Sequence, residues 1–155
     1  FYHKSTNQFW PILSLIFNRP DINHLDKSQR ADKEKESELI ARRQHFLTEQ
    51  HIGLWDVIKS CDIKGSSDSF IKAPVYNDLA SLHTQCPHLQ HIYFSSQKAF
   101  QYYQDYLRKN VADKGVLDWF DKMTEGESHI LPSPSSANAR KTLAQKRTDW
   151  QRIFE

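Results

Sequence analysis

The sequence predicts an α/β fold, a three-layer αβα sandwich around a short, mostly parallel sheet. Short β-branched and aromatic runs alternate along the chain with longer segments of helical periodicity. Strands interleaved with helices favour a parallel sheet that is covered on both faces. With 155 residues and 38% hydrophobic content the chain suits one domain, and we expect residues 1–155 to form it.

Three strands are expected from short apolar runs. They cover residues Ile52–Ile58, Leu89–Phe94 and His129–Leu131. A turn-rich loop, Cys61–Ser69, follows the first of them. Ligands of parallel sheets bind at the carboxyl ends of the strands, so this loop and the one after Leu131 are candidate ligand-facing segments.

Helices are expected from apolar spacing and capping residues. The first begins after Asn7, because Asn is a favoured cap. A charged surface helix extends from Ser28 to about Gln50, with Glu38 one turn before Arg42. The same signals predict two further helices, Gln97–Arg108 and a closing helix from near Ala139 that carries Trp150.

Composition excludes several classes of site. The net charge of +2 is too small to indicate a nucleic-acid binder by itself. No apolar run approaches the roughly 18 residues that a membrane span needs, so we expect no membrane association. Cys61 and Cys86 lack metal-site spacing, which favours free thiols in a reducing, cytoplasmic environment. We expect neither a metal nor another cofactor.

The segment Leu131–Ala139, with the sequence LPSPSSANA, joins the third strand to the closing helix. Its composition alone fits an ordinary connector, since turns are built from Pro, Ser and Asn. Small residues ahead of a helix also let a phosphate approach closely. Both interpretations stay open on composition.

The amino-acid sequence of the segment Leu131–Ala139 resembles the proline/serine loop of the uracil-DNA glycosylase superfamily, and most closely that of the hypoxanthine (deoxyinosine) DNA glycosylases. Three further segments resemble the same branch in the same order: residues 7–13 (NQFWPIL), 53–58 (GLWDVI) with the loop after it, and 77–79 (NDL). The resemblance implies a monofunctional base-excision repair enzyme. Such an enzyme hydrolyses the N-glycosidic bond of a deaminated base flipped out of DNA.

The resemblance also implies roles for individual residues. Asn7 matches the catalytic asparagine, which orients water near the sugar; on sequence alone it equally fits a helix cap. Base-binding roles fall on Tyr2, His3, Phe94, Ser95 and Asn77. DNA-binding roles fall on Ser133, Pro134, Ser135, Ser136, Asn138, Arg140 and Lys141. Several of these have plainer alternatives: core packing for Tyr2, a cap for Asn77 with Asp78, and a solvated face for the basic residues, which include Lys146.

Two departures bear on specificity. Phe94-Ser95-Ser96 stands where relatives have Phe-Asn-Gly, so a hydroxyl replaces an amide that could read the base. The family's first strand and its Gly-x-x-Pro-Gly turn are expected upstream of Phe1. The alternatives are a uracil- or mismatch-specific glycosylase of the same fold, a catalytically inactive DNA-binding relative, and a helical interaction domain. The expected partner is damaged double-stranded or single-stranded DNA, bound by a monomer.

Overall fold

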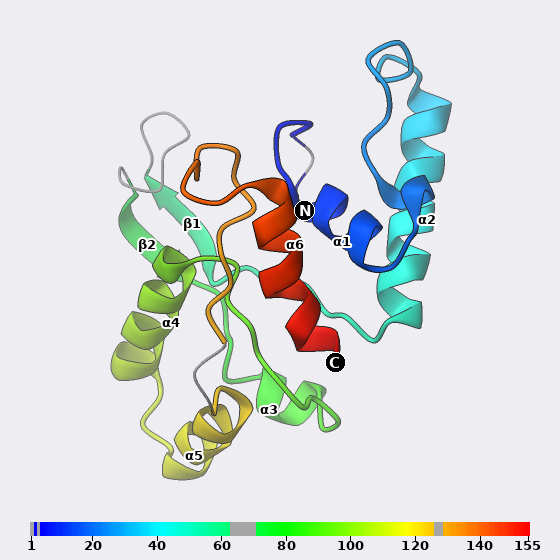
Figure 1. Cartoon of the computed structure of the whole chain (residues 1–155). Helices are drawn as coiled ribbons and strands as arrows, with labels where there is room; N and C mark the ends of the chain where they lie inside the picture. The colour runs from blue at the N-terminus through cyan, green and yellow to red at the C-terminus, as the bar shows by residue number, and fades with distance from the viewer. Residues whose placement is uncertain (1, 3, 63–70, 126–128) are drawn as a thin grey trace. The chain divides into compact units, whose positions relative to one another are not determined.

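The structure is a computed structural model of the chain and describes residues 2, 4–62, 71–125 and 129–155 (Figure 1). The chain divides into two compact units. The first unit combines Phe1–Leu54 with Pro132–Glu155, and the second is Trp55–Leu131. The expectation of a single domain stays a prediction.

The described residues contain both helices and strands, which confirms the mixed α/β class. The elements are, in chain order, α1 (Phe9–Ile16), η1 (Pro20–Ile22), α2 (Lys33–Glu49), β1 (Ile58–Asp62), β2 (Lys72–Tyr76), α3 (Leu82–Gln85), α4 (Gln97–Asn110), α5 (Lys114–Met123), α6 (Leu143–Gln151) and η3 (Arg152–Phe154). The three-layer arrangement around a parallel sheet stays a prediction.

The strands of the second unit differ from the expected ones. β1 pairs with β2 in antiparallel orientation, with Ile58 opposite Tyr76. The strand therefore begins at Ile58, where the sequence predicted it to end, because the pairing partner faces residues 58–62 rather than 52–58. The first two residues of the expected loop Cys61–Ser69, Cys61 and Asp62, belong to β1, and residues 63–70 lie outside the described residues.

One parallel contact lies where two strands were predicted. Phe94 N donates to His129 O over 2.7 Å and Leu131 N donates to Phe94 O over 2.8 Å. This makes a single parallel bridge between Phe94 and Ile130. The predicted strands at 89–94 and 129–131 thus meet in parallel at one point.

An aromatic cluster forms the core of the second unit. Its buried members are Leu79, Phe94, Tyr103, Tyr106 and Phe120. α4 supplies both tyrosines, and it begins after Ser96, whose side chain accepts from Ala99 N as a cap does. α5 supplies Phe120 and follows the capping residue Asp113.

Helices dominate the first unit, where α1 packs against α6 and α2 packs against η1 (Figure 1). α6 begins at Leu143 rather than near Ala139, because Thr142 and Gln145 form a reciprocal capping box. Phe9 lies between Trp10 and Trp150, with ring centroids 5.0 and 5.7 Å away. None of the helices in the described part of the chain is long and apolar enough to cross a membrane.

Candidate functional site

An open hollow of about 400 Å³ lies in the first unit. Its lining residues come from the two ends of the sequence: Tyr2, Lys4, Thr6 and Asn7, and Ser135 and Ser136. The two segments with the strongest family resemblance therefore meet at one surface. The hollow is the best candidate for a functional site within the first unit.

Asn7 lies two residues before the start of α1, next to the N-cap residue Gln8, and contacts the first residue of the helix. The Asn7 Oδ1 accepts from Phe9 N over 2.9 Å, which satisfies an amide that the helix itself leaves unpaired. Asn7 is therefore not the N-cap residue, which is Gln8, but its side chain still accepts from the first N–H of the helix. Because Oδ1 is used in this way, the Asn7 side chain has its NH2 group left for a further partner, and that group has no hydrogen bond among the described residues.

Tyr2 lines the hollow and also packs. Its ring stacks on Phe9 with 4.3 Å between centroids and 18° between planes. The Tyr2 backbone has a φ of 55°, a left-handed conformation that is uncommon for a bulky residue. Tyr2 is half-buried, so the structure supports packing on Phe9 and leaves part of the side chain at the hollow. His3 lies outside the described residues.

The loop of residues 132–139 is held by its own hydroxyl groups. Ser133 Oγ accepts from Ser135 N over 3.2 Å, and Ser135 Oγ accepts from Ala137 N over 3.3 Å. Asn138 N donates to Ser135 O over 3.1 Å. These contacts fold the loop into successive turns, so its amides do not form the N-terminus of α6.

Gln8 and Lys146 join this loop to the start of α1. Gln8 N donates to Pro134 O over 2.7 Å. The Lys146 ammonium donates to Gln8 Oε1 over 2.7 Å and to Ser135 O over 3.1 Å. Lys146 is only 1% exposed, and this burial lowers its pKa. The interpretation of Lys146 as a solvated surface charge is wrong: its buried ammonium group links the loop to Gln8 by hydrogen bonds.

The two basic residues predicted to contact DNA are both exposed. Arg140 lies between the loop and α6. Lys141 forms an ion pair with Asp149 of α6, which offsets part of its charge. Arg140 is therefore the better candidate of the two for a phosphate contact.

The other predicted base-binding residues lie in the second unit. Phe94 is 4% exposed and its ring packs against Phe100 and Tyr103, so it serves the core of that unit. Ser95 follows it and is half-buried. The Asn77 side chain donates to Asp56 O over 2.7 Å. The expected cap at Asn77 and Asp78 is wrong: the residue before α3 is Ser81, without a side-chain cap, and the Asp78 carboxylate accepts from Ser81 N ahead of the helix.

Sequence reasoning missed a network behind Asn7, formed by the half-buried His24 and the buried Arg43 and Trp10. His24 Nε2 lies 2.8 Å from Asn7 O, and His24 Nδ1 lies 3.3 Å from an Arg43 guanidinium nitrogen. Arg43 Nε donates to Ile22 O over 2.9 Å, and the guanidinium stacks 4.4 Å from the Trp10 ring. One signal could have revealed it: Arg43 occupies the packed stripe of α2 between Leu39 and Phe46.

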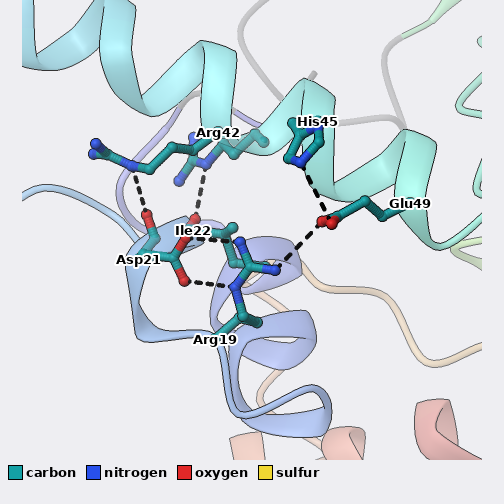
Figure 2. Close-up of polar contacts among 7 residues, drawn as sticks. Arg19, Asp21, Ile22, Arg42, His45 and Glu49 are labelled. Carbon is teal, nitrogen blue, oxygen red and sulfur yellow. Dashed lines mark hydrogen bonds and ion pairs between the residues drawn. The ribbon is translucent and has the colours of Figure 1, made fainter.

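A surface cluster of charged side chains joins η1 and the residue before it to α2. Arg19 forms ion pairs with Asp21 and Glu49, and His45 contacts Glu49 (Figure 2). Arg42 donates to Asp21 O over 3.3 Å. All these side chains are more than one-third exposed, so the cluster lies in solvent. The predicted one-turn pair of Glu38 and Arg42 is present at 3.4 Å.

Two curated proteins match the chain along nearly its whole length. A hypoxanthine DNA glycosylase of Methanosarcina acetivorans is 29% identical over 154 residues, covering 99% of this chain and 78% of the relative. A hypoxanthine DNA glycosylase of Methanosarcina barkeri is 26% identical over 155 residues, covering 100% of this chain and 79% of the relative. The chain is related to the hypoxanthine DNA glycosylases.

This relationship to hypoxanthine DNA glycosylases agrees with the branch that the ordered motifs resemble. Each match spans the motif before α1 and the loop before α6, since it covers almost every residue. No protein-family model and no solved structure matches the chain. The relationship therefore rests on these relatives and on the motifs.

Proposed function

We propose that the chain is a DNA glycosylase that releases hypoxanthine from DNA by hydrolysing the N-glycosidic bond of deoxyinosine. The observation that carries the proposal is the hollow, which gathers Asn7 and the loop serines of the two motifs that resemble the hypoxanthine DNA glycosylases. The names of the two relatives support the same activity. We further propose membership of the uracil-DNA glycosylase superfamily.

The reaction requires access to a sugar carbon that is hidden in the base stack. Glycosylases gain it by flipping the nucleotide into a pocket, at a cost of a few kcal/mol of unstacking energy. In this proposal the aromatic ring of Tyr2 walls the flipped base, because a flat π face suits a purine. Tyr2 stacks on Phe9, so its ring is already held in place before DNA binds.

Asn7 is proposed to act at the reacting sugar. Its Oδ1 is engaged by Phe9 N, so the NH2 group is the part that can act, and an NH2 group donates hydrogen bonds. The Asn7 NH2 group can donate a hydrogen bond to the oxygen of a water molecule, but it cannot remove a proton from that water. Catalysis then depends on orienting the water and stabilising developing charge, which preorganised dipoles do well.

The loop serines and Arg140 are proposed to hold the DNA backbone. Ser135 and Ser136 line the hollow, and Arg140 is exposed close to them in sequence. Contacts of this kind set the position of a protein on DNA without reading its sequence. The loop is suited to the task because its internal hydrogen bonds fix its shape before binding.

The test is single-turnover base release from a duplex that carries one deoxyinosine, with a matched uracil duplex beside it. The parent, Asn7→Ala and Asn7→Ser are compared. Ser keeps an oxygen that can accept from Phe9 N, so it preserves this contact with the helix start while removing the NH2 group. We expect both variants to be slower by about 100-fold, the scale of one preorganised contact.

Urea unfolding separates catalysis from stability. Asn7→Ala should lower the free energy of unfolding by about 1 kcal/mol because Phe9 N loses its side-chain acceptor, while Asn7→Ser should lose less. Abasic sites should be cleaved only after alkali, as expected of a monofunctional enzyme. Release of uracil but not hypoxanthine would overturn the substrate, and binding of duplex DNA without release of either base would overturn the enzymatic activity.

A further inference from the structure

Both backbone polar atoms of Asn7, its N–H and its carbonyl oxygen, have hydrogen-bond partners. Asn7 N donates to Lys4 O over 2.8 Å, and Asn7 O lies 2.8 Å from His24 Nε2. Phe9 N fixes the side-chain oxygen. The position of the remaining NH2 group thus depends on a contact from a residue outside the hollow.

Arg43 decides which nitrogen of His24 carries the proton. A guanidinium group only donates hydrogen bonds, so the Nδ1 atom that faces Arg43 must accept. The proton then lies on Nε2, which donates to the Asn7 carbonyl. The direction of donation runs from Arg43 through His24 to Asn7.

Arg43 is itself well fixed. It is 7% exposed, and it donates to Ile22 O and stacks on Trp10. Among the described residues no carboxylate pairs with it. Burial lowers the pKa of Arg43 to about 10, so the group stays charged near neutral pH and keeps its donors.

We propose that His24, held by Arg43, is a positioning residue that fixes Asn7 for base release. The inference rests on the proposed function of Asn7. His24 does not line the hollow and reaches Asn7 through its backbone carbonyl, so it acts on the geometry of Asn7 and not on the substrate. Displacements of about 1 Å at a reacting group are enough to slow catalysis by about 100-fold.

Protonation of His24 would break this arrangement, because a protonated ring cannot accept from Arg43. Burial lowers the pKa of His24, the Asn7 carbonyl raises it, and the positive charges of Arg43 and Arg30 lower it further. The net lowering keeps the ring neutral near neutral pH. Below that range the proton brings a second positive charge against Arg43.

The experiment measures single-turnover release of hypoxanthine at saturating enzyme, together with the affinity for the same duplex. Four proteins are compared: the parent, His24→Leu, His24→Gln and His45→Leu. Gln has both an amide donor and an oxygen acceptor but does not titrate. His45 is the matched control because its side chain is 71% exposed on α2 and belongs to the surface cluster.

We expect His24→Leu to be slower by about tenfold to 100-fold, with duplex affinity little changed. His24→Gln should regain most of the rate near neutral pH and should lose the acid-side decline of the parent. His45→Leu should match the parent. A purely structural role of His24 would not move the pH profile in this way.

Each other result decides a different question. If the parent releases no hypoxanthine, the proposed function fails. If the parent is active and Asn7→Ala is slow, but His24→Leu keeps the parental rate, only the positioning role is overturned. If His24→Leu lacks a cooperative urea transition, His24→Gln decides: an acid-side decline identical to that of the parent overturns the proposal.

Discussion

Arg42 and Arg43, neighbours in α2, both donate to backbone carbonyls of η1, but one is exposed and the other is buried. Arg42 joins the surface cluster, where Glu38 and Asp21 supply oxygen acceptors in solvent. Arg43 is buried and meets neutral groups, a carbonyl, an imidazole and an indole ring. Exposed pairs contribute little to stability, whereas a buried polar group that loses its partner costs far more. The number of charged partners is therefore a poor guide to how much an arginine contributes to stability.

The largest effect on stability is expected at Arg43. Arg43→Met leaves Ile22 O and His24 Nδ1 without a donor, and we expect the free energy of unfolding to fall by about 2 kcal/mol. Arg42→Met, one residue away, should change it by less than about 0.5 kcal/mol. Urea unfolding of both variants checks this, and equal losses would contradict the distinction between the two environments.

Lys146 extends the comparison to a second buried cation. Lys146→Met removes the donor of Gln8 Oε1 and Ser135 O, and we expect a loss of about 1 kcal/mol near neutral pH. Lys141→Met is the exposed control, with an expected change below about 0.5 kcal/mol. Burial lowers the Lys146 pKa, so the unfolded chain holds more protons below 10.5 and the parent gains stability relative to the variant as pH rises through that range.

A smaller, pH-dependent effect is expected at His24. Its lowered pKa means that the unfolded chain takes up a proton first as the pH falls below 6.5, so the folded parent loses stability there. His24→Gln cannot titrate and should lack this part of the decline. Thermal unfolding of both proteins across that range measures it, and parallel curves would show that His24 keeps its ordinary pKa.

The smallest effect belongs to the surface cluster. A double-mutant cycle on Glu38 and Arg42 should give a coupling of about 0.3 to 0.5 kcal/mol, as for other exposed pairs one helical turn apart. The coupling should shrink in high salt because exposed charges are screened. A value that is large and independent of salt would place Arg42 with the buried Arg43 instead.

The sequence predicted local features better than distant contacts. The helix after Asn7, the charged helix and α4 follow from caps and apolar spacing, which act within a few residues. α5 was missed although Asp113 precedes Val116, Phe120 and Met123 at helical spacing. The strand at 58–62 was placed too early because a short apolar run does not say which residues a partner strand will face.

The site shows the same limit. Resemblance located Asn7 and the loop serines, and the hollow unites them. The burial of Arg43 and Lys146 and the contacts of His24 were not predicted, since these residue types are those of a solvated surface and their partners lie far away in the sequence. The roles given to Phe94 and Asn77 stay predictions, and the structure shows these side chains packed or bonded within the second unit.

The two-part origin of the first unit has a consequence for the order of events during synthesis. Asn7 is made before the second unit, but Ser135, Ser136 and Lys146 are made after it. The second unit, Trp55–Leu131, is one continuous stretch and is complete before them. The ribosome must therefore synthesise the whole second unit before the hollow can close, and a nascent chain that ends before Pro132 carries Asn7 without the loop serines.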